Sequence, residues 1–199
     1  MPAPPRLILA STSRYRSELL ARLRLPFDVV APGVDESPWP DEAPRALAER
    51  LALAKAQAVA AQHPQAVVIG ADQVAELDGA AIGKPHTHVR ALAQLRLMSG
   101  RRVSFHTAVA VVCRERGFAR GLLAPVVVTF RTLADEEIEH YLRTEQPYDC
   151  AGSAKSEALG IALLAAIDSD DPTALVGLPL IRTCELLRAA GLDPLAAAR

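Results

Sequence analysis

Asp72 is the side chain whose sequence context points most directly to chemistry. It follows the apolar run at 66–71, which predicts a buried interior strand that ends at this carboxylate. Enzymes with α/β folds bind ligands at the ends of such strands, and Gly70 would let another group approach the backbone closely. Capping the start of a loop is the other role open to Asp72.

Candidate partners of Asp72 stand on two other segments. Lys84 belongs to Gly83-Lys84-Pro85, and Glu36 belongs to the acidic pair Asp35-Glu36. Two carboxylates and lysines around a phosphate suit a hard divalent cation such as Mg²⁺ or Mn²⁺. The fold must decide whether these groups meet.

An anion site is indicated at Ser11-Thr12-Ser13-Arg14-Tyr15-Arg16. Ser13 is a good N-cap, so Arg14 and Arg16 would lie in a first helical turn, where the positive end of the helix dipole disfavours cations. A phosphate would remove this conflict, because free N–H groups, three hydroxyls and Arg16 could hold a triphosphate. A solvated, capped helix start is the alternative.

Lys55 lies on a predicted helix over 44–62, between Leu51 and Val59 on the apolar stripe. An ammonium is costly to bury without a partner. Lys55 therefore either extends to solvent at the edge of the stripe or meets a carboxylate or phosphate in a site.

Several other side chains have plainer interpretations. His86 and His88 could bind a metal, but two histidines on a turn more often face solvent. Trp39 stands between prolines and is interpreted as a loop anchor or a subunit contact. Three widely spaced cysteines favour reduced thiols over disulfides or a zinc site; they are Cys113, Cys150 and Cys184.

The elements that must position these residues alternate between helix and strand. Strands are predicted at 6–10, 27–31, 66–71, 103–113 and 122–131, and helices after Ser13 and at 44–62, 87–98, 135–143 and 176–190. Asp78-Gly79 predicts a tight hairpin, the loop at 32–40 is rich in proline and acid, and Gly191 would stop the last helix. This pattern predicts an α/β fold with a mixed twisted sheet, flanking helices and a long antiparallel hairpin, in a single domain over 1–199.

The composition limits the partners. With 22 basic and 23 acidic residues the net charge is -1, so no broad cationic surface is expected to hold nucleic acid or an anionic membrane. No segment is long enough to cross a bilayer, and the apolar run at 7–10 is shorter than a signal-peptide core. The expected location is the cytoplasm.

The order and spacing of several motifs resemble the Maf-like nucleoside triphosphate pyrophosphatases. These motifs are S-T-S-R-Y-R-S-E-L-L at 11–20, V-D-E at 34–36, L-A-K-A at 53–56, G-A-D-Q-V at 70–74, G-K-P at 83–85, A-G-S at 151–153 and V-G-L-P at 176–179. Gln73 and the segment 151–161 resemble the branch that acts on 7-methyl-GTP. Two departures are Arg14, where most relatives are expected to have proline, and Tyr15, where this branch often has tryptophan.

The resemblance implies a fold like that of Maf and ITPase proteins and a role for each motif. Asp72 would be the proton acceptor and, with Glu36, would hold a divalent metal cation (Mg, Mn or Co). The phosphates would be bound by Ser13, Arg16, Lys55 and Lys84. The specificity positions would be Tyr15, Gln73 and Glu157; without the resemblance, Glu157 and Lys155 would be a plain surface pair.

The implied reaction is hydrolysis of a nucleoside triphosphate, 7-methyl-GTP in this branch, to the monophosphate and pyrophosphate. The alternatives are another nucleotide (dTTP, UTP or CTP), an ordinary phosphatase, and a nucleotide-binding regulator without turnover. The expected partner is a small-molecule nucleotide, with no nucleic acid and no membrane, and a homodimer is left open.

Overall fold

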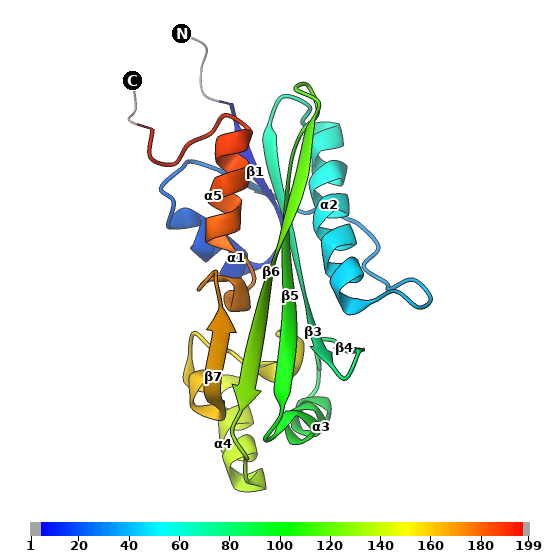
Figure 1. Ribbon diagram of the computed structural model, residues 1–199, viewed down its shortest axis with the longest axis vertical. Helices are drawn as coiled ribbons and strands as arrows, with labels where there is room; N and C mark the ends of the chain where they lie inside the picture. The colour runs from blue at the N-terminus through cyan, green and yellow to red at the C-terminus, as the bar shows by residue number, and fades with distance from the viewer. Residues whose placement is uncertain (1–4, 197–199) are drawn as a thin grey trace.

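The computed structural model describes residues 5–196, in which helices flank a central mixed sheet (Figure 1). The strands are β1 (Leu7–Ala10), β2 (Asp28–Val30), β3 (Val67–Leu77), β4 (Ala80–Ile82), β5 (Arg102–Cys113), β6 (Phe118–Phe130) and β7 (Leu164–Ser169). The α-helices are α1 (Arg14–Ala21), α2 (Pro44–Gln62), α3 (His88–Met98), α4 (Asp135–Glu145) and α5 (Leu180–Ala189), and short 3₁₀ segments lie at Ala151–Ser153, Leu159–Leu163 and Ala174–Val176.

The strand order is β2-β1-β3-β5-β6-β7, and β4 pairs with the far part of β3. β1 is parallel to β2 and β3, whereas the pairs β3–β4, β3–β5, β5–β6 and β6–β7 are antiparallel. The predicted mixed α/β sheet is confirmed, and β5 with β6 forms the predicted long hairpin.

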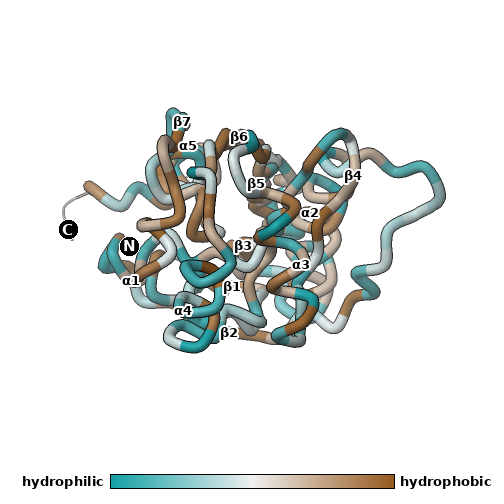
Figure 2. Tube along the Cα trace, turned by 90° about the horizontal axis from the view of Figure 1, so that it is seen from below, coloured by the Kyte–Doolittle hydropathy of each residue, from teal (hydrophilic) through white to brown (hydrophobic). Residues whose placement is uncertain are grey.

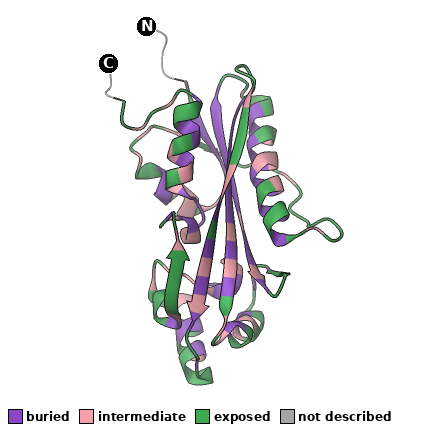
Figure 3. Cartoon of the chain, viewed as in Figure 1, coloured by how far each residue is buried: buried purple, intermediate pink, exposed green. Residues whose placement is uncertain are grey.

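Alternation of side chains along the strands divides the core between the two faces of the sheet. α2 packs on one face, where Leu51 and Val59 join Val68 of β3. α1 and α5 pack on the opposite face, around Ile69, and α3 and α4 cover that same face farther along the strands, around Phe105. The buried residues therefore follow the strands between these helices (Figure 3).

The loop between β2 and α2 projects beyond the sheet and carries mostly hydrophilic residues (Figure 2). The prediction of an exposed loop at 32–40 is therefore confirmed. None of the helices in the described residues is both long and apolar enough to cross a bilayer.

The predicted elements differ from the observed ones in several places. β3 does not end at Asp72 but continues to Leu77, because its pairing with β5 runs on to Glu76 and Ser104. The last helix starts at Leu180 and not at 176, because Gly177 adopts a φ of 119°. β7 was not predicted at all, since its alternation is weak and most of it is exposed.

Candidate active site

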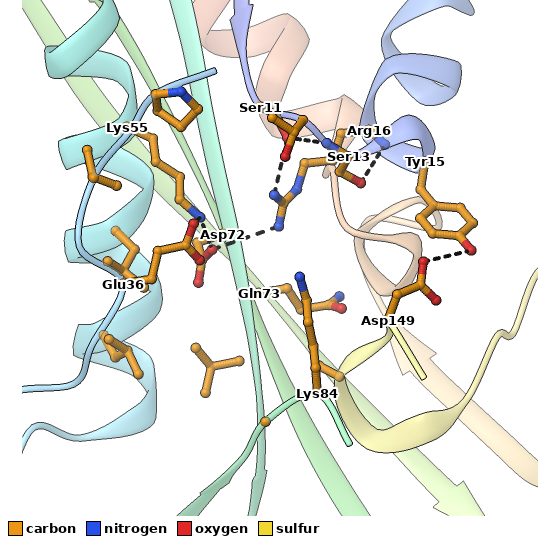
Figure 4. A pocket seen from close by; sticks show the side chains of 18 of the residues that line it. Ser11, Ser13, Tyr15, Arg16, Glu36, Lys55, Asp72, Gln73, Lys84 and Asp149 are labelled. Atoms are coloured by element: carbon orange, nitrogen blue, oxygen red, sulfur yellow. Dashed lines mark hydrogen bonds and ion pairs between the residues drawn. The ribbon is translucent and has the colours of Figure 1, made fainter. Parts of the chain in front are cut away.

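A cavity of about 1080 Å³ opens near the middle of the sheet, beside the end of β1. The side chains that converge on it come from the start of α1, the loop after β2, α2, β3 and the segment after β4 (Figure 4). Its lining includes Ser11, Ser13, Tyr15, Arg16, Glu36, Lys55, Asp72, Gln73, Lys84 and Asp149. Most of the predicted site residues are thus brought together.

Asp72 lies where β1 stops covering β3. The last pair that β1 forms with β3 is Ala10 with Gly70, and β4 begins to pair only at Ala75. β5 covers the other edge of β3 without a break. The strand that ends beside Asp72 is therefore β1, and the gap between β1 and β4 opens the site.

Asp72, Lys55 and Glu36 form a cluster of charges at this gap. The Nζ atom of Lys55 lies 2.6 Å from Oδ1 of Asp72 and 3.0 Å from Oε1 of Glu36. Lys55 is 3% exposed and Asp72 6%, so Lys55 reaches into a site and does not extend to solvent. The side chain of Glu36 is 55% exposed and approaches from the loop.

Gly70 allows α2 to bring Lys55 this close. A Cβ at Gly70 would lie 2.2 Å from the carbonyl oxygen of Ala52 and 2.6 Å from the nitrogen of Ala56, both in the backbone of α2. The group that approaches Gly70 is therefore the helix that carries Lys55.

The cluster fits a divalent cation that shares its ligands with phosphates. In the described residues no three His, Cys, Asp or Glu side chains gather as a metal cage. Mg²⁺ is usually held by only one or two carboxylates plus substrate phosphates and water. Both carboxylates meet at Lys55, and Asp72 makes its contacts through Oδ1, which leaves Oδ2 for another ligand.

Arg16 lies on the other side of Asp72. Its Nε donates to the carbonyl of Gly177 at 3.0 Å, Nη1 donates to Oγ of Ser11 at 3.4 Å, and Nη2 lies 3.9 Å from Oδ1 of Asp72. Burial lowers the pKa of Arg16, while the charges of Asp72 and Glu36 oppose this shift. Arg16 is therefore a largely buried cation directed at the cavity, with a side chain that is 15% exposed.

Two hydroxyl groups of the anion site predicted at 11–16 already accept hydrogen bonds from the backbone of the same segment. Oγ of Ser13 caps α1 by accepting from the N–H of Arg16 at 3.4 Å, and Oγ of Ser11 accepts from the N–H of Ser13 at 3.1 Å. The N–H groups of Arg14 and Tyr15 have no acceptor within the helix. Backbone N–H groups and arginine, more than hydroxyls, remain for an anion.

Lys84 extends from the segment after β4 into the cavity (Figure 4). Within residues 5–196 it forms no ion pair with a carboxylate. Its charge is therefore available to an anionic ligand.

Tyr15 and Asp149 lie together at the opposite side of the cavity from Glu36 (Figure 4). The hydroxyl of Tyr15 is 3.5 Å from Oδ2 of Asp149, and the guanidinium of Arg14 lies 5.0 Å from the centre of the Tyr15 ring. Burial raises the pKa of Tyr15, with the neighbouring Cys150 as the next cause. Tyr15 thus presents a neutral aromatic ring, and sequence reasoning gave no signal for Asp149.

Gln73 has only one end free. Its Nε2 donates to Oγ1 of Thr107 at 2.9 Å and to the carbonyls of Ala174 and Leu175, both at 3.0 Å. Thr107 is fully buried and itself donates to Ala174. The amide is therefore oriented with its nitrogen away from any ligand, and Oε1 can act only as an acceptor.

Glu157 is not brought to the cavity. It is exposed, and it is absent from the residues that line the cavity, which Asp149 and Ala151 do line. Asp171, which no sequence pattern singled out, is fully buried and accepts from the N–H groups of Ile181 and Arg182 at the start of α5. It helps to fix the loop whose Gly177 holds Arg16.

The histidines, the cysteines and the tryptophan singled out in the sequence differ in their surroundings. His88 contacts the hydroxyl of Tyr148 and a carboxylate oxygen of Glu139, at 3.0 and 3.1 Å, whereas His86 lines the cavity. All three cysteines are free thiols, as predicted, and burial raises the pKa of Cys150 to about 12. Trp39 is stacked on Arg50 of α2, which agrees with a loop anchor.

The chain is similar over most of its length to one protein family and to relatives that share one name. The family model for Maf-like protein matches residues 6–190. A 7-methyl-GTP pyrophosphatase of Polaromonas sp. is 69% identical over 93% of this chain and 84% of its own. A protein of the same name from Albidiferax ferrireducens is 66% identical over 98% of both chains. Another, from Burkholderia pseudomallei, is 64% identical over 95% of this chain and 89% of its own.

Proposed function

Because this chain belongs to the Maf-like protein family, we propose that it is a nucleoside triphosphate pyrophosphatase that hydrolyses 7-methyl-GTP to 7-methyl-GMP and pyrophosphate. The observation that carries the proposal is the convergence of one buried carboxylate, Asp72, with the cations Arg16, Lys55 and Lys84 on a single cavity. Relatives that are 64–69% identical bear the name of this activity. Removal of modified nucleotides from the nucleotide pool would be its role.

In the proposed mechanism Asp72 accepts a proton from the water that attacks the α-phosphorus. The new bond joins the water oxygen to the α-phosphorus, and the bond from that phosphorus to the bridging oxygen breaks, so pyrophosphate leaves with the bonding electrons. Lys55 orients Asp72 through the contact at 2.6 Å. Arg16 and Lys84 neutralise charge that develops on the phosphates.

Glu36 and Asp72 are the residues that would hold a divalent cation (Mg, Mn or Co). When bound, it would neutralise negative charge on the phosphates and polarise the bond to the leaving group. Lys55 keeps the two carboxylates close together, with Nζ within 3.0 Å of each. This arrangement supports a shared cation site completed by the substrate.

The base is proposed to bind at Tyr15 and Gln73. Methylation at N7 makes guanine cationic and strengthens its stacking on an aromatic face such as Tyr15. Oε1 of Gln73 would accept from a donor on the base, since Nε2 is already committed to Thr107 and two carbonyls. Glu157 is proposed to accept from the N1–H and exocyclic amine, for which its exposed side chain would have to turn into the cavity.

Analysis of the products from a nucleotide panel tests the proposal. The purified protein is incubated with 7-methyl-GTP, GTP, UTP, CTP and dTTP and Mg²⁺, Mn²⁺ or Co²⁺, and pyrophosphate and orthophosphate are measured separately. We expect pyrophosphate, with the highest kcat/KM for 7-methyl-GTP. Orthophosphate as the first product would indicate a phosphatase, binding without turnover would indicate a regulator, and preference for another base would revise only the substrate.

A further inference from the structure

We propose that Arg50 is a positioning residue for Glu36: it fixes the loop between β2 and α2 so that the Glu36 carboxylate lies beside Lys55 and Asp72. The inference rests on the proposed function, in which Glu36 helps to hold the metal. Arg50 does not line the cavity and acts through Glu36.

Glu36 needs such support because the loop that carries it has no regular structure. It lies in a long connection without helix or strand, between Val30 and Pro44. Its side chain is 55% exposed, and within residues 5–196 its one ion pair is with Lys55, at 3.0 Å. An exposed loop without regular structure samples many positions, whereas a metal ligand must be held within a fraction of an ångström.

Arg50 holds this loop against α2 through several contacts. Its Nε and Nη2 donate to the two carboxylate oxygens of Glu42, at 2.5 and 2.7 Å, and Nη2 also donates to the carbonyl of Ser37 at 3.0 Å. The guanidinium lies 4.2 Å from the centre of the Trp39 ring. The N–H of Trp39 in turn donates to Glu42 at 3.0 Å.

The backbone of Ser37, the residue next to Glu36, is held through both its carbonyl and its N–H group. The carbonyl of Ser37 accepts from Arg50, and the N–H of Ser37 donates to Oδ1 of Asp35 at 2.9 Å. Arg50 and Lys55 belong to the same helix, which Gly70 lets pack directly on β3. One rigid element therefore holds both the carboxylate of Glu36 and the backbone beside it.

The arrangement requires arginine in particular. A planar guanidinium can bind a carboxylate through two parallel bonds, donate to a carbonyl and stack on an aromatic ring at once, which an ammonium cannot do. Glu42 is only 6% exposed in its side chain, and its hydrogen bond with Arg50 lowers its pKa. Replacement of Arg50 by lysine keeps the charge and removes this geometry.

Arg50→Lys in the full-length chain tests the inference, with Arg45→Lys as its matched control. Arg45 is on the same helix but, in the part of the chain that the structure describes, pairs only with Glu49, at 3.4 Å. Trp39 is the sole tryptophan, so its emission reports directly on the loop. Binding of Mn²⁺ alone is measured by the loss of the free-ion signal in electron paramagnetic resonance, and pyrophosphate release is measured across Mn²⁺ concentrations.

For Arg50→Lys we expect lower anisotropy of Trp39 emission and an Mn²⁺ dissociation constant raised by about 10-fold or more, the usual range for residues that orient a metal ligand. The Mn²⁺ concentration for half-maximal activity should rise equally, while kcat at saturating Mn²⁺ recovers to within about twofold. Arg45→Lys should match the wild type. In a Glu36→Gln background, Arg50→Lys should change Mn²⁺ affinity little further.

Unchanged Mn²⁺ affinity in Arg50→Lys, or no measurable Mn²⁺ binding by the wild type, overturns the inference. If Arg50→Lys does not fold, Glu42→Gln weakens the same contact and must show the same shift in smaller degree. If the wild type binds Mn²⁺ but releases no pyrophosphate from any nucleotide, the proposed function fails, and the Mn²⁺ and Trp39 measurements still decide the role of Arg50.

Discussion

The ammonium of Lys55 lies 2.6 Å from Oδ1 of Asp72, and both side chains are almost completely buried. The pair joins helix α2 to strand β3 at the edge of the cavity. Because removal of one partner leaves an uncompensated buried charge, this contact links the stability of the fold to the chemistry of the site.

Asp72→Asn is expected to keep the fold, at lower stability because Lys55 loses its closest carboxylate, and to lower turnover by about 10² to 10⁴-fold, because an amide is a poor base. Circular dichroism and thermal unfolding check the fold, and kcat for pyrophosphate release is the measurement. A folded variant that keeps more than about a tenth of wild-type kcat would contradict the role of Asp72 as the base.

Lys55→Met should lower the free energy of unfolding by about 3 to 5 kcal/mol, because Asp72 stays buried without its closest cation. Urea denaturation measures the loss. Added Mn²⁺ should recover more stability in this variant than in the wild type, since the two carboxylates are left facing each other.

Lys84→Met is the control for that experiment. It removes the same charge from an exposed lysine and should change stability by no more than about 0.5 kcal/mol. Equal losses in the two variants would contradict the structural role of the Lys55–Asp72 pair.

Gly70→Ala should destabilise the protein by about 1–3 kcal/mol or more, because the new Cβ would collide with backbone atoms of α2, which cannot move aside as a side chain does. Gly121→Ala in β6 is the control, since its Cβ would find ordinary contacts of 3.5 Å or longer. Thermal unfolding of both variants is the measurement, and similar melting temperatures would refute the close approach of α2.

Tyr15→Ala should reduce the preference for 7-methyl-GTP over GTP, because stacking on a cationic base is lost. A cation–π contact of about 0.5–2 kcal/mol corresponds to roughly 2- to 30-fold in kcat/KM. Tyr15→Trp should keep or increase the preference. Equal losses for both nucleotides in Tyr15→Ala would show that Tyr15 supports the fold or the phosphate site instead.

Glu157→Ala should lower kcat/KM for 7-methyl-GTP and GTP by about 10-fold or more relative to UTP, if Glu157 accepts from the guanine edge. Asp149→Ala provides the comparison, because Asp149 lines the cavity and Glu157 does not. Loss of guanine preference in Asp149→Ala alone would transfer the role to Asp149.

The sequence by itself determined the elements whose signals are local. The helix at 44–62, the N-cap at Ser13 and the turn at Asp78-Gly79 were all predicted at the positions observed. Each depends on residues within a few positions of one another: proline at a helix start, a hydroxyl three residues before the N–H it accepts from, and two residues that tolerate a positive φ. The family motifs likewise singled out Asp72, Lys55 and Glu36 before the fold was known.

Only the tertiary structure decided how those residues are arranged. β3 runs past Asp72 because β5 pairs with it, through partners that lie 28 to 34 residues later in the chain. The gap at Asp72 exists because β1 stops at Ala10. Gln73 is oriented by carbonyls 101 and 102 residues away. Such contacts join segments that come together only when the sheet forms and the helices pack on it, so no pattern of neighbouring residues could reveal them.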